Sequence, residues 1–299
     1  MSPERCGAHM QTRCRRQRNH YPNGFQLPNM RILFIGGGNM ATALIGGLLK
    51  QGLAASDIRV VELSEDARHR LKQAFGVATQ AGLDEAGVVE DVVLLAVKPQ
   101  HLRDVAQWLR PHLHGQLVVS IAAGIRTADL SRWLGGHGRI VRAMPNTPAL
   151  LRAGITGLYA APKATRADRN AAQRVLGAVG TVIWLDNEER MDGVTAVSGS
   201  GPAYVFYFIE ALQEAAQELG FSEEQARSLA VETFVGAAKL AAGSTEPPAA
   251  LRARVTSKGG TTERALEVME SCELKGRVVD AVRAAARRSG ELGDEFGKT

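Results

Sequence analysis

The first half of the chain alternates short apolar segments with longer segments that mix apolar and polar residues. Residues 31–36, 91–99 and 117–125 are apolar almost throughout, which is typical of strands buried on both faces of a parallel sheet. Residues 41–53 and 64–75 have helical patterns, and the second of these opens with a serine followed by acids. This alternation predicts a doubly wound α/β sheet with helices on both faces. Further strands are predicted at residues 57–63, 139–146, 154–160 and 181–186.

The second half has a different pattern. No strand pattern follows Asp186, and two long helices are predicted at 202–220 and 222–243, separated by a tight Gly-Phe turn. Two shorter helices are predicted at 263–271 and 276–292. These helices are rich in alanine and glycine and carry apolar residues on more than one face, so a small helical domain would leave apolar surface uncovered. We therefore expect this half to pack against another subunit, with a domain boundary near residues 187–195.

Residues 1–29 differ from both halves. They contain Pro, Asn, Gly and Arg with neither helical nor alternating periodicity, and this predicts disorder. They carry five arginines and one glutamate, which leaves a targeting presequence or an arginine-rich nucleic-acid arm as open interpretations. Met30 directly precedes the first strand, as a start codon would. We therefore interpret the extension as a cloning remnant or a misassigned start.

Composition narrows the functional class. The net charge of the chain is +5, and because residues 1–29 supply most of it, we expect no nucleic-acid surface on the rest. No apolar run is long enough for a membrane span. Cys6 and Cys14 lie in the extension, and Cys272 suits a reduced thiol, so we expect a cytoplasmic protein. An isolated H-x-H pair at residues 112–114 indicates a surface loop, and we expect no metal site.

A glycine-rich loop connects the first predicted strand to the first predicted helix. Residues 36–41, GGGNMA, fit the pattern G-x-G-x-x-A, in which Gly36 permits a tight turn and Gly38 lets a pyrophosphate approach the backbone. Ala41 allows the helix to pack closely on the strand, and the free N–H groups at the helix start attract phosphate. A glycine-rich turn without a ligand is the alternative. The strand–loop–helix context favours dinucleotide binding by a Rossmann-type sheet.

The choice of dinucleotide stays open from the sequence. Glu62 lies near the end of the second predicted strand, where an acid can hold the ribose hydroxyls of NADH and disfavour a 2′-phosphate. Ser64 and Arg68 follow it and could instead hold the 2′-phosphate of NADPH. Glu62 could also be no more than a solvated strand end.

The second half indicates what chemistry is excluded and where a substrate could bind. An alcohol dehydrogenase needs a His or Lys base, but residues 192–238 contain neither. Residues 255–262, VTSKGGTT, place two glycines and the hydroxyls of Ser257, Thr261 and Thr262 at a helix start. Such a start can bind a small carboxylate through its backbone N–H groups. A well-capped helix without a ligand is the alternative.

Six segments match a known family in their order and spacing. They are IGGGNM (35–40), AVKPQ (96–100), SIAAGI (120–125), MPNTP (144–148), AVSGSGPAYVFYFIEAL (196–212) and VTSKGGTT (255–262). Over about residues 30–292 the chain therefore resembles the pyrroline-5-carboxylate reductases. The resemblance implies reduction of 1-pyrroline-5-carboxylate to L-proline with NADPH or NADH, the last step of proline biosynthesis. A cyclic imine accepts hydride directly, which agrees with the missing base.

The resemblance also implies an architecture. It divides the chain into a dinucleotide-binding domain at residues 30–190 and a helical dimerisation and substrate domain at residues 191–299. The expected assembly is a homodimer, or a larger ring of dimers.

The matching positions imply roles for individual residues. The cofactor pyrophosphate is expected at Gly36, Gly38, Asn39 and Met40, and the rest of the cofactor along Ala96, Val97, Lys98 and Pro99. The nicotinamide side is expected at Ala122, Ala123 and Asn146, and Glu62 is kept as a cofactor-binding candidate. The substrate carboxylate is expected at Ser257, Gly260 and Thr261. Thr262 is the expected catalytic residue, which also binds substrate through a hydrogen bond to the ring nitrogen and donates or relays its proton.

The chain departs from the family pattern at three positions. Lys258 replaces the usual proline of the V-T-S-P-G-G-T-T segment, Ala253 replaces an aspartate, and Arg254 replaces an asparagine that reaches the cofactor across the dimer. Two alternatives remain: a reductase of a related cyclic imine, and a non-catalytic nucleotide-sensing relative. A β-hydroxyacid dehydrogenase is disfavoured because its helix lysine is absent.

Overall fold

A computed structural model describes residues 30–85 and 87–298. The expectations for residues 1–29 lie outside the described residues. The described chain forms one eight-stranded sheet in the order β3-β2-β1-β4-β5-β6-β7-β8. The strands are β1 Ile32–Ile35, β2 Ile58–Val61, β3 Ala78–Gln80, β4 Val92–Leu95, β5 Leu117–Ser120, β6 Ile140–Met144, β7 Gly154–Ala160 and β8 Gly180–Trp184.

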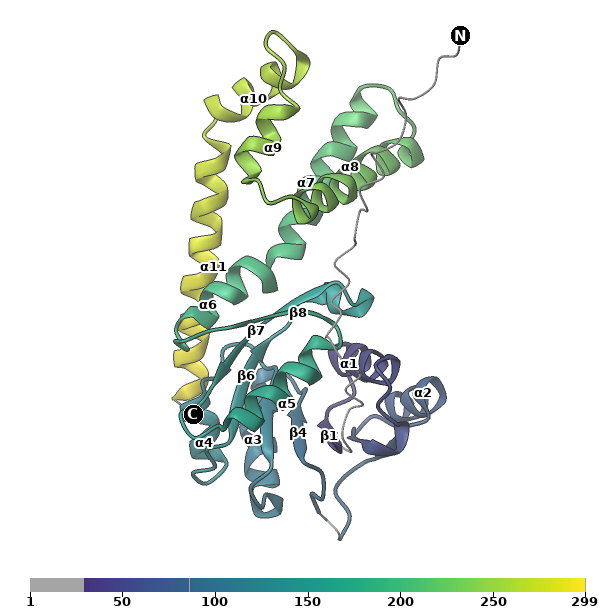
Figure 1. Ribbon diagram of the computed structural model, residues 1–299, viewed down its shortest axis with the longest axis vertical. Coiled ribbons are helices and arrows are strands. Elements are labelled where there is room, and N and C mark those ends of the chain that lie inside the picture. Colours follow the sequence, from purple (N-terminus) through teal and green to yellow (C-terminus); the bar gives the residue numbers. More distant parts are fainter. Residues whose placement is uncertain (1–29, 86, 299) are drawn as a thin grey trace, which may run out of the picture.

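Helices flank the sheet and continue beyond it (Figure 1). The sheet region, residues 30–184, also contains the helices α1 Asn39–Lys50, α2 Glu65–Phe75, α3 Pro99–Leu109, α4 Thr127–Trp133 and α5 Arg166–Gly177. The helical region, residues 190–297, contains α6 Arg190–Val194, α7 Gly201–Glu218, α8 Glu223–Gly243, α9 Pro248–Arg254, α10 Thr261–Ser271 and α11 Leu274–Gly297, with a π-helical turn, Thr195–Gly199, between α6 and α7.

The sheet topology confirms the predicted doubly wound fold. From β3 to β6 every neighbouring pair is parallel, with Ile32 of β1 in register with Ile58 of β2 and Val92 of β4. The strand order turns outward in both directions from β1, as in Rossmann-type sheets. β7 then pairs antiparallel with β6, and β8 pairs parallel with β7.

The core explains why the first strands are apolar at every position. Ile32 and Phe34 belong to the cluster on one face of the sheet, with Leu44 of α1. Leu33 belongs to the cluster on the other face, with Leu102 of α3. Alternate residues of one strand point to opposite faces, so both faces of β1 are buried under helices.

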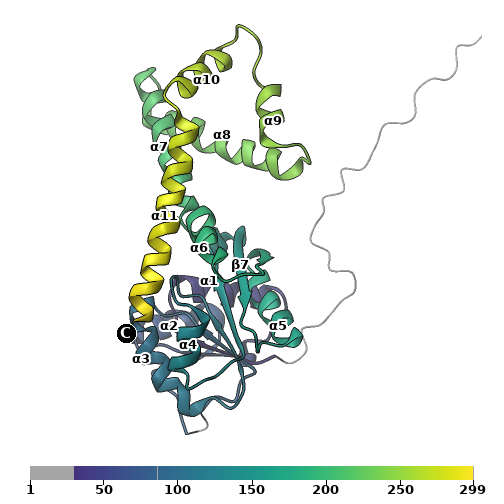
Figure 2. The same ribbon diagram turned by 90° about the vertical axis from the view of Figure 1, so that its left-hand side faces the viewer.

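The later helices extend away from the sheet and then return to it. Figures 1 and 2 show α7, α8, α9 and α10 at the far end, and α11 running from there back to the sheet region. Helix α8 starts with a capping box in which Ser222 and Gln225 exchange side-chain and backbone hydrogen bonds. Among the described residues, no helix combines the length and apolarity that crossing a bilayer requires.

One predicted helix is longer in the structure, and one strand was missed. Residues 276–292 were expected to form a short helix, but α11 covers Leu274–Gly297 and has 24 residues. Its glycines weaken the helical pattern, and its packing on the sheet region outweighs them. Gly293 lies against Gly124, where a Cβ on Gly293 would be 3.0 Å from the carbonyl oxygen of Gly124. Strand β3 was not predicted, because three polar or small residues carry little strand signal.

Candidate functional site

The predicted glycine loop lies between β1 and α1 with the expected conformation. Gly36 has φ +99°, and a Cβ there would lie 2.7 Å from the carbonyl oxygen of Ala96. Its N–H donates to Val61 O at 2.8 Å. The loop therefore packs against the ends of β2 and β4, and only glycine fits at position 36.

Gly38 differs from Gly36 because the position where a side chain would lie is unoccupied. It has φ −70° and is the N-cap of α1, with no side-chain hydrogen bond capping the helix. A Cβ on Gly38 would meet no atom within 4 Å. The fold therefore tolerates a side chain at Gly38, and the open space in front of the free N–H groups fits the pyrophosphate of a dinucleotide.

Glu62 follows β2 and contacts the glycine loop directly. Its Oε2 accepts a 2.7 Å hydrogen bond from the N–H of Gly37, and its Oε1 accepts a 2.8 Å hydrogen bond from the N–H of Ser64. The Glu62 carboxylate is therefore bonded to the glycine loop rather than freely solvated, and its contact with a cofactor stays a prediction. The sequence pattern suggested the position but not the bond to Gly37.

The other predicted cofactor residues gather along the same edge of the sheet. Ala96–Pro99 follow β4, the segment with Ala122 and Ala123 follows β5, and Asn146 follows β6. The carboxyl ends of parallel strands meet at one edge of the sheet. The segment after β4 therefore neighbours the glycine loop, and the segments after β5 and β6 follow it along the same edge. Lys98 is exposed and is the N-cap of α3, whereas Ala122 is 3% exposed.

Asn146 has a structural role at this edge. Its Oδ1 accepts a 2.9 Å hydrogen bond from the N–H of Ile155, and its Nδ2 donates to Ser198 O at 3.1 Å. The amide thus joins the end of β6 to β7 and to the π-helical turn. A contact from Asn146 to a nicotinamide stays a prediction.

The predicted substrate residues lie at the start of α10. Gly260 is the N-cap, with no side-chain hydrogen bond capping the helix. Within the described residues, no hydrogen bond engages the hydroxyls of Ser257, Thr261 or Thr262, so these groups remain available to a ligand. Gly259 has φ +73°, and its N–H donates to the Glu263 carboxylate at 2.6 Å. The N–H of Gly260 donates to Ser257 O at 3.0 Å. Two N–H groups at the expected carboxylate site are therefore already used, which the sequence did not indicate.

Two of the departures from the family pattern lie beside this segment. Arg254 Nη2 forms a 2.6 Å ion pair with Glu246 Oε1, and the Arg254 side chain is 67% exposed. Lys258 is exposed in the loop before α10. The Arg254 side chain thus pairs with a residue of its own chain. Contact with a partner's cofactor would require this ion pair with Glu246 to break.

The two groups of predicted site residues are far apart within one chain. The glycine loop belongs to the sheet region, whereas α10 begins at the far end of the helical region (Figures 1 and 2). The structure therefore brings the cofactor residues together and the substrate residues together, but not the two groups with each other.

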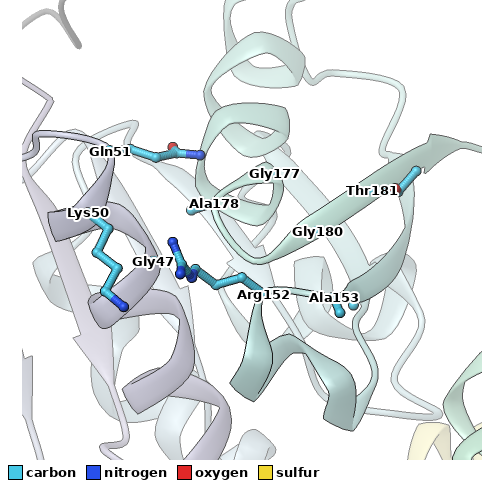
Figure 3. A pocket seen from close by; sticks show the side chains of 10 residues that line it. Gly47, Lys50, Gln51, Arg152, Ala153, Gly177, Ala178, Gly180 and Thr181 are labelled. Atoms are coloured by element: carbon cyan, nitrogen blue, oxygen red, sulfur yellow. The ribbon is translucent and has the colours of Figure 1, made fainter. Parts of the chain in front are cut away.

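A polar cavity of about 340 Å³ lies elsewhere on the sheet region (Figure 3). Lys50, Gln51 and Arg152 line it, together with Gly47 and Thr181. Helix α1 begins at the glycine loop and ends at this cavity, so the cavity is separate from the dinucleotide edge. No group of three metal-ligating side chains occurs in the part of the chain that the structure describes.

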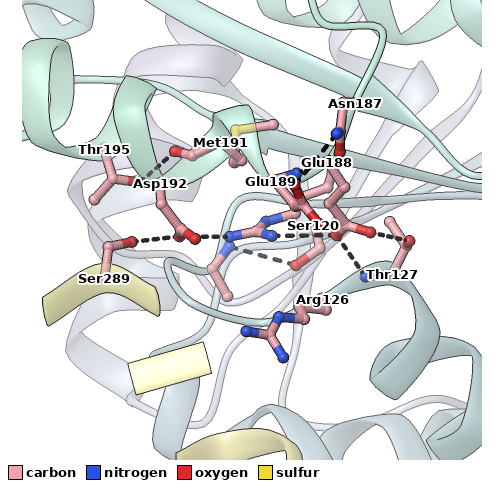
Figure 4. A network of polar contacts seen from close by, with 12 residues as sticks. Ser120, Arg126, Thr127, Asn187, Glu188, Glu189, Met191, Asp192, Thr195 and Ser289 are labelled. Carbon is pink, nitrogen blue, oxygen red and sulfur yellow. Dashed lines mark hydrogen bonds and ion pairs between the residues drawn. The ribbon is translucent and has the colours of Figure 1, made fainter. Parts of the chain in front are cut away.

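A buried polar network joins the sheet region to the helical region (Figure 4). Arg142 of β6, whose side chain is 5% exposed, contacts Glu188 at 3.1 Å and Asp192 at 3.9 Å. Ser289 of α11 donates to Asp192 at 2.7 Å. The Glu188 carboxylate accepts both the N–H and the hydroxyl of Thr127, at 2.8 and 2.6 Å.

This network contacts the loop after β5, where the nicotinamide side is predicted, and its residues were not identified from the sequence. Thr127 starts α4, directly after the segment that contains Ala122 and Ala123. A carboxylate at a helix start is favourable, so Glu188 holds this loop in place. The sequence signal was an arginine inside an apolar strand, which predicts a buried ion-pair partner.

A parallel sheet with a glycine loop at its first helix and an acid after its second strand defines a dinucleotide-binding protein. The family model for pyrroline-5-carboxylate reductase dimerisation matches residues 188–292. The family model for NADP oxidoreductase, coenzyme F420-dependent, matches residues 31–124.

Three individual proteins show the extent of the similarity. A pyrroline-5-carboxylate reductase of Pseudomonas aeruginosa is 46% identical, over 90% of this chain and 98% of that protein. The structure of a pyrroline-5-carboxylate reductase from Coxiella burnetii is 42% identical with a TM-score of 0.84, covering 88% of this chain and 98% of that one. A Plasmodium falciparum pyrroline carboxylate reductase with NADP bound is 28% identical with a TM-score of 0.79, covering 89% and 98%. The chain belongs to the pyrroline-5-carboxylate reductase family.

Proposed function

We propose that this protein reduces the C=N bond of 1-pyrroline-5-carboxylate to give L-proline, the last step of proline biosynthesis, with NADPH or NADH as hydride donor. Membership of the family, at 46% identity over 90% of the chain, is the observation that carries this proposal. The open space at Gly38, in front of uncapped N–H groups of α1, supports dinucleotide binding. The bound nicotinamide would supply a hydride to the carbon of the C=N bond.

The residues of the chain bind the reactants and supply the proton. Gly36 shapes the loop, and the α1 N–H groups after Gly38 bind the pyrophosphate, with Asn39 and Met40 in the first turn. Ser257, Gly260 and Thr261 hold the substrate carboxylate. The Thr262 hydroxyl donates a hydrogen bond to the ring nitrogen, which gains one proton as the carbon gains hydride. We assign these roles to a dinucleotide-binding domain at 30–190 and a helical dimerisation and substrate domain at 191–299.

Turnover of Thr262 variants tests this assignment. Thr262→Ala is expected to lower kcat about 10²-fold, because a positioned proton donor is lost. The dissociation constant of the cofactor should stay unchanged, since Thr262 contacts only the substrate. Thr262→Ser should recover most of the rate. Ser271→Ala, at the other end of α10, is the matched control. A cofactor affinity that falls as far as kcat would refute the role of Thr262.

Each active site is proposed to form between two protomers. The separation of the glycine loop and the start of α10 in one chain supports this proposal. The substrate segment of one protomer would then lie over the cofactor edge of its partner. Exposed apolar side chains of α7, with Phe206 62% exposed and Tyr207 71% exposed, provide a surface for this dimer.

Mixing two variants of strongly reduced activity tests whether the site is shared. Thr262→Ala keeps an intact cofactor edge, and Gly38→Val keeps an intact substrate segment. Random exchange of protomers should restore about one quarter of the wild-type activity, because half of the dimers are mixed and each has one intact site. Activity no higher than that of the separate variants, in mixtures where mass spectrometry shows mixed dimers, would place both groups of residues in one chain.

Larger rings of dimers, the absence of nucleic-acid partners and a cytoplasmic location remain proposals. Self-association itself agrees with the match to the dimerisation family over residues 188–292. Light scattering measures the size of the assembly, and cell fractionation measures the location.

A further inference from the structure

We propose that Glu62 makes NADH, rather than NADPH, the preferred hydride donor of this protein. The inference rests on the proposed dinucleotide site. Glu62 lies directly after β2, beside the glycine loop. In a Rossmann-type site this position faces the adenosine ribose, which is where NADH and NADPH differ.

Two hydrogen bonds from backbone N–H groups hold the Glu62 carboxylate in place. Gly37 N–H donates to Oε2 at 2.7 Å and Ser64 N–H donates to Oε1 at 2.8 Å. A carboxylate oxygen can accept more than one hydrogen bond, so both oxygens keep capacity for a donor. The 2′- and 3′-hydroxyls of NADH are donors. The 2′-phosphate of NADPH offers ionised acceptor oxygens, and facing a carboxylate they repel it.

The two residues that could reverse this preference are engaged with their own loop. The Ser64 hydroxyl accepts a 3.3 Å hydrogen bond from Ala67 N–H and caps α2. Arg68 Nη1 donates to the carbonyl oxygens of Glu62 and Leu63, both at 2.7 Å. The guanidinium is thereby held on the backbone of the β2–α2 loop.

The charge around this loop also disfavours a phosphate. The first turn of α2 adds two exposed acids, Glu65 and Asp66, to Glu62. Residues 62–66 therefore carry three carboxylates, whereas the guanidinium of Arg68 is bonded to the loop backbone. An additional phosphate group would raise the local negative charge further.

Direct titration of the full chain with each cofactor, without substrate, tests the inference. Isothermal titration calorimetry is expected to show NADH binding about tenfold more tightly than NADPH, because like charges face each other only with NADPH. Glu62→Gln keeps the size of the side chain and removes its charge, so it should lower this ratio about tenfold. Asp104→Asn, which removes an exposed carboxylate from α3, is the matched control and should leave the ratio unchanged.

Several outcomes would overturn the inference. NADPH binding as tightly as NADH to the wild-type protein would do so, even if Glu62→Gln fails to fold. A ratio that is the same in Glu62→Gln and wild type would do so as well. Binding of neither cofactor would overturn both the inference and the dinucleotide site. NADH preference without turnover of the imine would leave the inference intact and refute the proposed reaction. Turnover of the imine with equal use of NADH and NADPH would refute the inference and leave the proposed reaction intact.

Discussion

The sheet region and the helical region bury their apolar residues in opposite ways. Around β1, side chains such as Phe34 and Leu44 are fully buried by the chain itself. After residue 196, the buried apolar residues of the described chain are three alanines, Ala216, Ala226 and Ala230. Many of the large apolar side chains there are exposed, and others, such as Phe208 and Ile209, are only partly buried. The exposed ones include Val205, Phe206, Tyr207, Leu212, Leu219, Phe221, Leu229, Val235, Leu240, Val255, Val268, Met269 and Val279.

Helix α7 shows the difference most clearly. Val205, Phe206 and Tyr207 are 42%, 62% and 71% exposed. Successive residues of a helix are 100° apart, so three exposed neighbours uncover most of its circumference. A helix of this kind needs a partner surface that its own chain does not supply. The sheet region therefore has a core of its own, whereas the helical region completes its core by association.

The largest expected effect is the loss of association in Phe206→Glu. One Phe side chain is removed from each side of a two-fold interface, at about 1.5–3 kcal/mol each, so the dimer should lose about 3–6 kcal/mol. Light scattering across a dilution series measures this loss. Leu63→Glu, which changes an 84% exposed leucine of the sheet region, is the control and should keep the wild-type mass. An unchanged dimer in Phe206→Glu would mean that this face of α7 is not the interface.

A core truncation in the sheet region should destabilise the fold without any dependence on assembly. Phe34 is 0% exposed, and Phe34→Ala is expected to cost about 3–5 kcal/mol of unfolding free energy. Urea denaturation should show the same loss at low and at high protein concentration. Leu63→Ala is the control, with an expected change below about 0.5 kcal/mol. A cost for Phe34→Ala that depended on concentration would contradict an independent core.

The network at Arg142 should matter next, because it connects the two regions. Arg142→Leu leaves Glu188 and Asp192 without their buried cation and should cost about 2–4 kcal/mol. Hydrogen exchange in the last turns of α11 should become faster. Arg126→Leu breaks an exposed pair with Asp294 and should cost less than about 1 kcal/mol. Equal costs for the two variants would show that α11 is not held through Arg142.

The smallest expected effect is a pH-dependent one inside the sheet region. Burial alone would raise the pKa of Asp168, but hydrogen bonds from Arg139 and Thr165 lower this pKa below its usual value. The ionised Asp168 carboxylate therefore stabilises the folded state fully above the unfolded-state pKa of about 3.9. This stabilisation is lost as the pH falls through the folded-state pKa. Asp168→Asn should cost about 1–2 kcal/mol at neutral pH, and this cost should shrink below about pH 4.

Denaturation of both proteins between pH 3 and pH 7 measures that difference. The control is Asp186→Asn at an exposed position, where the substitution should change the free energy of unfolding by less than about 0.5 kcal/mol. A cost for Asp168→Asn that stayed constant down to pH 3 would contradict the lowered pKa.

Strand and helix types in the sheet region could be predicted because local pattern and burial agree there. Continuous apolar runs, such as residues 31–36 and 117–125, identified the buried parallel strands. The short strand β3 was not predicted from the sequence, because it lies at the sheet edge, where a strand can be polar and lacks an apolar pattern. Helix α11 was underestimated because glycines lower helix propensity, while the contact of Gly293 with Gly124 requires a small residue.

The site could be predicted in its parts but not in its assembly. The glycine spacing alone distinguished the turn at Gly36 from the open position at Gly38, since backbone conformation and ligand approach are local properties. The bond from Gly37 to Glu62 joins residues 25 apart, and the contact of Ser289 with Asp192 joins residues 97 apart. No local pattern specifies such distances.

The sequence by itself therefore determined the doubly wound sheet, the dinucleotide loop and the family resemblance, because each is recognised from local patterns and motifs and from their order along the chain. Only the tertiary structure decided the orientation of Glu62, the buried network at Arg142 and the separation of the substrate segment from the cofactor edge. Those features depend on which distant segments pack together. Packing is set by the summed burial of many side chains rather than by any one motif.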